Sequence, residues 1–152
     1  MALFKLIHLL AVLIWIGGMF FAYVVLRPAA LEVLEAPQRL RLWDAVLRRF
    51  FNWVWGVVGA LLVSGLYMIY LYGGLMHVPR HVHVMLALGI VMMMIYGYVF
   101  FACYVSLSLN VAKQHWKEAG EQLAWIRRLV GLNLALGLLT VCVVKISLIS
   151  VG

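Results

Sequence analysis

The sequence predicts an all-α integral membrane protein that folds as an up-down-up-down four-helix bundle. Its 152 residues are 67% hydrophobic and only 11% charged, whereas a soluble domain is about 45–50% apolar and about 25% charged. Four long apolar stretches divide the chain, and each supplies the ~20 residues that a helix needs to cross the hydrocarbon layer. These stretches are expected to be helices because lipid offers no hydrogen-bonding partner to backbone N–H and C=O groups.

The four predicted helices form a single transmembrane domain over residues 1–152. The first covers about residues 3–26 and stops at Arg27-Pro28. The second covers about residues 46–73 and stops at Gly73-Gly74, and the third covers about residues 81–111. The fourth covers about residues 125–151, and Lys145 is the charge that interrupts its apolar run.

The basic residues predict the orientation of the bundle. The loops between the first and second stretches and between the third and fourth contain Arg27, Arg39, Arg41, Arg48, Arg49, Lys113, Lys117, Arg127 and Arg128. The other side holds Lys5, Arg80 and Lys145. By the positive-inside rule the two basic loops are cytoplasmic. Both termini are therefore expected on the outer side, which in a bacterial inner membrane is the periplasm.

Two basic segments next to the apolar stretches are expected to lie at the cytoplasmic interface as helices. In residues 37–49, Leu40, Trp43 and Leu47 recur three or four positions apart among arginines. Residues 113–128 have a similar pattern, with Trp116 and Trp125 as interfacial anchors. Both segments indicate membrane anchoring rather than chemistry.

Composition and motifs exclude several classes of protein. The net charge of +7 is carried mainly by the basic loops, and it indicates contact with anionic lipid headgroups rather than with nucleic acid. Cys103 and Cys142 lie in apolar runs without CxxC spacing, so we expect inert thiols and no disulfide framework. No nucleophile–base pair, paired carboxylates or phosphate-binding loop is present in the sequence.

The residues that predict chemistry gather near the outer ends of the helices. They are His8, His77, His81, His83 and Lys145, and ionisable residues in such positions are usually functional. His8 and His83 begin the first and third helices at similar depth, which suits axial ligation of a heme b iron between helices. Trp15 is expected to line the slot, and Lys145 is placed to pair with a propionate.

Copper is the second metal that these residues allow. Imidazole and thioether ligands favour it, and His77, His81 and Met85 lie close together in the sequence near the outer side. The run Met92, Met93, Met94 is instead interpreted as lipid-facing or packing side chains, because consecutive helical residues point in different directions.

Several segments resemble the copper-resistance protein D (CopD) family of small four-helix bacterial membrane proteins. They are HLLAVLIWIGGMFF (residues 8–21), LRPA (26–29), VLRRFFNWVW (46–55), HVMLALGIVMM (83–93) and RRLVGLNLALGLLTV (127–141). The layout is also similar to HemJ-type protoporphyrinogen IX oxidase, which shares the pattern of His8, Trp15, His83 and a terminal Val-Val-Lys145. In this chain Met85 replaces that family's lysine in the third helix. The resemblance to that family implies heme b binding, with His8 as the first ligand and His83 as the second.

Three functions follow as hypotheses. The first is a heme b-binding redox protein of the inner membrane, an electron-transfer protein or oxidoreductase that acts on a quinone or tetrapyrrole, with a periplasmic redox partner. The second is a copper uptake or resistance protein that uses outer histidines and methionines. The third is a structural membrane subunit without a cofactor. A homodimer is also expected, because Gly56, Gly59 and Ala60 form a pattern of small residues that lets helices pack closely.

The predicted orientation can be tested by cysteine labelling. With Cys103 and Cys142 replaced, we expect His77→Cys to react with a membrane-impermeant maleimide in whole cells. Gln38→Cys is expected to react only after the membrane is opened, since the basic loop that contains it is cytoplasmic. Labelling of the Gln38→Cys variant from outside would show that the topology is inverted.

Overall fold

The computed structural model describes the backbone of residues 1–149 and the side chains of residues 1–144. The first long helix is built from α1 (Ala2–Phe20), a π-helical segment η1 (Phe21–Leu26) and α2 (Arg27–Val33), and α3 (Ala36–Leu71) follows. A short 3-10 turn, η2 (Leu75–His77), leads to α4 (Arg80–Tyr98), the π-helical segment η3 (Val99–Tyr104) and α5 (Val105–Ala112). The last helix is α6 (Trp116–Ile149). The prediction of an all-α chain with four long apolar helices is confirmed, since four helices of this part are long and apolar enough to cross a membrane.

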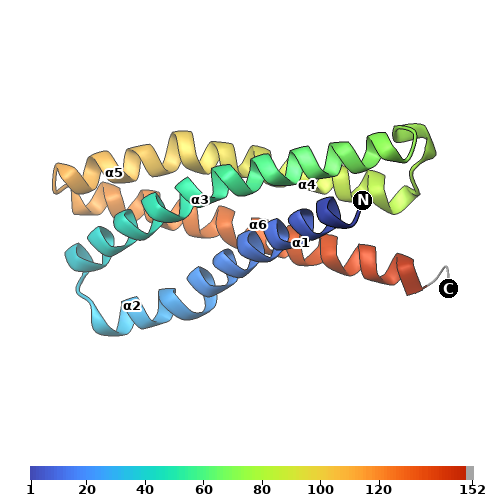
Figure 1. Cartoon of the computed structure of the whole chain (residues 1–152). Helices are drawn as coiled ribbons and strands as arrows, with labels where there is room; N and C mark the ends of the chain where they lie inside the picture. Colours follow the sequence, from blue (N-terminus) through green and yellow to red (C-terminus); the bar gives the residue numbers. More distant parts are fainter. Residues whose placement is uncertain (150–152) are drawn as a thin grey trace.

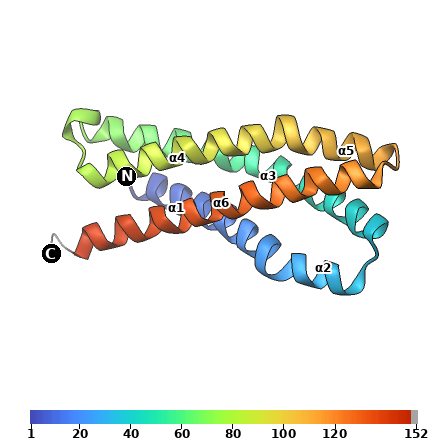
Figure 2. The same ribbon diagram turned by 180° about the vertical axis from the view of Figure 1, so that it is seen from behind.

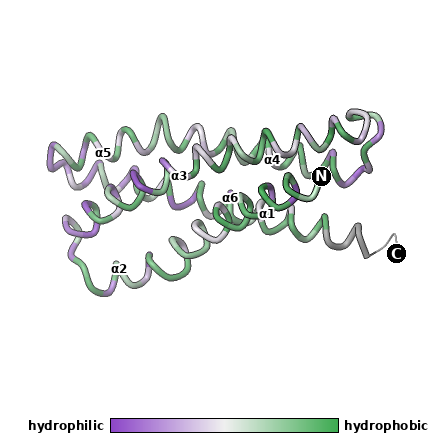
Figure 3. Tube along the Cα trace, viewed as in Figure 1, coloured by the Kyte–Doolittle hydropathy of each residue, from purple (hydrophilic) through white to green (hydrophobic). Residues whose placement is uncertain are grey.

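The helices run alternately up and down, so α1 begins and α6 ends at the same end of the bundle (Figures 1 and 2). We call this the terminal end, and the end that carries the α2–α3 and α5–α6 connections the basic end. Helix α1 packs against α3. Helices α4 and α5 both pack against α6, which also contacts α1 and α3. Hydrophilic residues gather at the basic end and around η2, while the middle of the bundle is hydrophobic (Figure 3).

The first long helix extends past the point where the sequence predicts its end. Helix continues through Arg27-Pro28 to Val33, although proline lacks an N–H and clashes with the preceding turn of an α-helix. The π-helical segment η1 precedes it, and the N–H of Arg27 bonds to the carbonyl of Ala22, five residues back. This wider turn changes the hydrogen-bond register just before Pro28, so the chain continues without a break. By contrast, α3 ends at Leu71 as predicted, before Gly73 and Gly74, whose φ angles of +90° and +96° favour glycine.

The two basic segments are helical, and each leads directly into a long helix of the bundle. Residues 37–49 form the first turns of α3, and Leu40, Trp43 and Leu47 are buried in the core. Residues 116–128 likewise form the first turns of α6, where Ala119 and Leu123 are buried. The apolar residues of both segments therefore face each other and the bundle, and they lengthen the core beyond the apolar stretches at the basic end.

An aromatic cluster around Phe51 holds the middle of the bundle together. Phe51 is 2% exposed, and its ring lies 5.1–5.7 Å from the rings of Tyr96, Phe100 and Tyr104 on the third long helix. The hydroxyl of Tyr96 donates a hydrogen bond to the backbone carbonyl of Phe51 over 3.2 Å. These contacts join α3 to α4 and η3.

The small residues expected at a dimer contact lie on an open face of α3. Gly56 and Gly59 are exposed, and a Cβ atom at either position would meet no atom within 4 Å. Trp53, on the same helix, is 71% exposed. The homodimer stays a prediction.

The aromatic cluster predicts where truncation destabilises the bundle. We expect Phe51→Ala to lower the free energy of unfolding by about 3–5 kcal/mol, because a buried ring is removed and a cavity remains. The matched control is Phe101→Ala, since Phe101 is 66% exposed and its loss is expected to cost far less. Unfolding in detergent measures both, and equal losses of stability would contradict this description of the core.

Candidate functional site

All four long helices contribute to a cavity at the terminal end of the bundle. Its volume is about 400 Å³, within the range of roughly 300–1,000 Å³ that is typical of ligand pockets. Its walls are almost entirely apolar, and the polar side chains among its lining residues are Lys5, His8, Tyr72 and Thr140, with the indole of Trp15. We call it the His8 cavity.

The hydrogen bonds of His8 define which ring nitrogen is available to a ligand. Nδ1 of His8 lies 2.9 Å from Oγ of Ser64 on α3. The Ser64 hydroxyl uses its one proton in a bond to the carbonyl of Ala60, at 2.5 Å. Nδ1 therefore carries the proton and donates it to Ser64, which leaves Nε2 as the nitrogen with a free lone pair. A histidine that binds a metal usually has this kind of partner on its other nitrogen.

The residue after Ser64 makes room for the imidazole. A Cβ atom on Gly65 would lie 3.4 Å from Cε1 and 3.8 Å from Nδ1 of His8. Any side chain larger than a methyl group would therefore compete with the ring for space. Ser64 is 1% exposed, so the hydrogen bond that orients His8 is shielded from solvent.

Thioether side chains form the second group of donors in the His8 cavity. Met68 of α3 and Met85, Met92 and Met93 of α4 line it. The three residues of α4 lie at positions i, i+7 and i+8, which places them on one face of the helix. Met94, the next residue, is 62% exposed and points away. The expectation that the Met92–Met94 run is lipid-facing or packing is confirmed: Met92 lies in the core, Met93 packs against it and Met94 faces outward. What the sequence did not indicate is that Met92 and Met93 also line the cavity.

Two of the other expected site residues belong to this region. Trp15 lines the cavity, is 3% exposed and stacks edge-on against Tyr96 at 6.1 Å between ring centroids. Lys145 follows Val144, which lines the cavity, but its side chain lies outside the described residues. Lys5, one turn before His8, is a lining cation that the sequence did not single out.

The outer histidines are placed differently from His8. His83 is exposed on α4, does not line the cavity, and its Nδ1 bonds to the carbonyl of Pro79 at 3.3 Å. His77 is exposed and bonds to the carbonyl of Gly73 at 3.0 Å. His81 is half-buried at the start of α4. The structure thus brings His8 together with Met85, but it does not bring His83 to the same cavity.

Sequence reasoning missed Ser64, Met68, Met92 and Met93. Ser64 interrupts an otherwise apolar stretch and precedes a glycine, and that is the signal that points to it. Met92 and Met93 are found by extending a helical face from Met85 by two turns. The described residues contain no group of three or more His, Cys, Asp or Glu side chains that could hold a metal ion.

Four apolar spans around a cavity define the class, a multi-pass helical membrane protein. The chain belongs to the copper resistance protein D (CopD) family, whose model matches residues 44–146. The match includes Ser64 and all four cavity methionines, while His8 precedes it. No curated protein and no solved structure matches the chain.

The hydrogen bond from His8 to Ser64 gives a prediction that needs no ligand. NMR of nitrogen-labelled histidine at mildly alkaline pH is expected to show His8 protonated on Nδ1. In Ser64→Ala that preference is expected to weaken, because the hydroxyl acceptor is gone and the Leu61 backbone carbonyl is the acceptor that remains for His8. The control is Thr140→Ala, whose hydroxyl lines the same cavity but bonds to the Leu136 carbonyl of its own helix at 2.8 Å. An unchanged His8 tautomer in Ser64→Ala would contradict the proposed hydrogen-bond direction.

Proposed function

We propose that the protein handles copper in the membrane and binds copper(I) in the His8 cavity. The ligands are Nε2 of His8 and thioether sulfurs of the cavity methionines. The observation that carries this proposal is that one oriented imidazole and four methionines line a single, largely apolar space.

The donor set supports copper(I) over other metals. Thioether ligands are soft and select copper(I), whereas magnesium, calcium and manganese prefer oxygen donors. Met85 is the residue shared with the copper site expected from the sequence, and His8 takes the place of His77 and His81 as the imidazole. A site of neutral ligands also leaves the bound ion with a single positive charge, which an apolar cavity tolerates better than two.

The position of the cavity supports uptake from the terminal end. Val78 and Val82 line the cavity, and the segment between them carries His81, with His77 immediately before it. An ion that reaches η2 therefore meets imidazoles first and the His8 cavity next. With the orientation expected from the sequence, this end faces the periplasm, and copper moves inward from that side.

Heme b is the second candidate, and the position of Lys5 favours it. Lys5 and His8 lie one turn apart on α1 and line the same cavity, so an ammonium is available to a propionate and an imidazole to the iron. The volume and apolar walls also suit a flat macrocycle. In that function the protein transfers electrons or oxidises a quinone- or tetrapyrrole-type substrate, in which the iron supplies the redox chemistry.

Metal analysis of the purified protein tests the copper proposal. We expect about one copper(I) per chain after loading under reducing conditions, and strongly weakened binding in His8→Ala. Ser64→Ala is expected to weaken binding by about 10–100-fold, because it removes the partner that orients the ligand. Binding is measured by competition with a copper(I) chelator in detergent.

Matched variants and the absorption spectrum separate the alternatives. Met85→Leu, which nearly preserves volume, is expected to weaken copper binding, whereas the exposed Met94→Leu and His83→Ala are expected to leave it unchanged. A Soret band that shifts on reduction and is lost in His8→Ala would establish heme and contradict copper. A colourless protein that binds neither would refute both and leave the structural subunit.

A further inference from the structure

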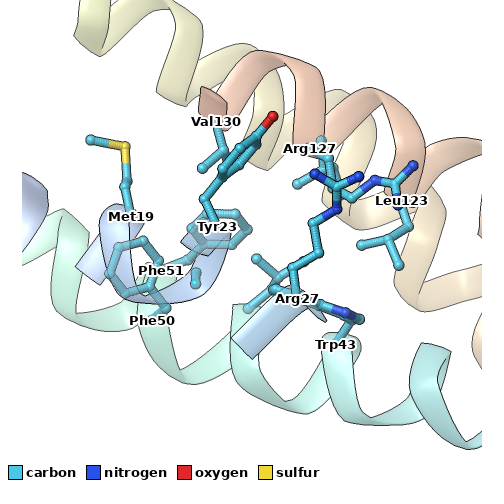
Figure 4. Close-up of a pocket in the computed structure, with 12 residues that line it drawn as sticks. Met19, Tyr23, Arg27, Trp43, Phe50, Phe51, Leu123, Arg127 and Val130 are labelled. Carbon is cyan, nitrogen blue, oxygen red and sulfur yellow. The ribbon is translucent and has the colours of Figure 1, made fainter. Parts of the chain in front are cut away.

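A second site lies at the basic end, where two arginines converge on a small recess. Arg27 at the start of α2 and Arg127 on α6 line it, together with Tyr23 of η1 (Figure 4). Its free volume is about 30 Å³, enough for about two water-sized groups. The other lining residues are apolar and include Met19, Trp43 and Leu123.

Neither arginine has an acidic partner in the described part of the chain. Nε of Arg27 is buried and has no hydrogen-bond partner, and its guanidinium lies over the ring of Tyr23, 5.4 Å from the centroid. The groups whose charges act on Arg127 are Arg27, Arg39, Arg128 and Tyr23, with no carboxylate among them. Asp44 is the acidic residue of α3 at this end of the bundle, and it lies near Tyr104 and Arg48 instead. The two half-buried guanidinium groups therefore repel each other, and no carboxylate among the described residues offsets their positive charge.

Such an arrangement is costly unless an anion occupies it. Like charges in surroundings of low dielectric repel strongly, and a buried N–H of a guanidinium without an acceptor loses its hydration. Guanidinium groups present planar forks of N–H donors that match the oxygens of a phosphate group. Two non-bridging phosphate oxygens would supply both the negative charge and the missing acceptors.

The surroundings favour a lipid as the source of that phosphate. Arg27 follows an apolar run of α1 and η1, and Arg127 precedes the apolar part of α6, so both lie at the depth of headgroups. Just above them, Phe20, Phe21 and Val24 are 48–55% exposed on the outside of the first long helix, which offers a surface for acyl chains. Basic pockets between helices on the cytoplasmic side are known to bind anionic headgroups.

We propose that Arg27 and Arg127 hold the phosphate group of an anionic phospholipid of the cytoplasmic leaflet. The lipid phosphate then bridges the first long helix and α6 at the basic end of the bundle. This site is separate from the His8 cavity and does not depend on copper or heme.

Native mass spectrometry of the full chain in mild detergent tests this proposal. With added phosphatidylglycerol we expect one lipid to stay bound, and phosphatidylcholine to be retained much less. In Arg27→Gln/Arg127→Gln retention is expected to fall by about tenfold or more, since each basic residue near an anionic surface contributes on the order of fivefold. The matched control is Arg48→Gln/Arg49→Gln, which removes the same charge from two exposed arginines outside the recess and is expected to retain the lipid.

Other outcomes would overturn the proposal. Equal losses in the two double variants would assign the binding to net charge, and equal retention of phosphatidylcholine would remove the preference for an anion. Binding of inorganic phosphate without retained lipid would replace the lipid by a soluble phosphate. If the double variant does not fold, Arg127→Gln alone is measured, and unchanged retention in that variant refutes the site.

Discussion

Every backbone N–H and C=O group that lies in hydrocarbon has to find its hydrogen-bonding partner within the chain. Four long helices meet this constraint, and the details of the bundle follow from it. The helix passes Pro28 because the π-helical segment η1 changes the bonding register just before it. Buried polar side chains bond mainly to backbone carbonyls, as Tyr96 does with Phe51 and Asn133 with Met92.

The two ends of the bundle meet this constraint in opposite ways. At the terminal end, Ser64 satisfies one nitrogen of His8 and leaves the other for a ligand within a largely apolar cavity. At the basic end, Arg27 and Arg127 bring charge together without a counter-ion from the described residues. The first site offers a neutral electron-pair donor, which suits a soft cation or a heme iron. The second offers N–H donors and positive charge, which suit an oxyanion.

The aromatic cluster explains why the cavity lies where it does. Around Phe51, rings from α3, α4 and η3 fill the space between the helices. Toward the terminal end the lining consists mostly of aliphatic side chains, methionines and glycines, with the rings of Trp15 and Tyr72 among them. Gly65 and Gly89 remove side-chain volume directly from its walls. The aromatic cluster therefore holds the helices together, and the half with smaller side chains keeps an open space of a size that a ligand can use.

The sequence by itself determined the all-α class, the four apolar helices and the break at Gly73-Gly74, because composition, stretch length and glycine conformation are local properties. It also singled out His8 and Trp15 for a heme site and Met85 for an alternative copper site. Only the tertiary structure decided that Ser64 and the methionines Met68, Met92 and Met93 join His8, and that His83 faces outward. The physical reason is the rotation of each helix about its axis. Sequence position gives the depth of a side chain along the helix, but packing against the neighbouring helices decides whether it points into the bundle or away from it.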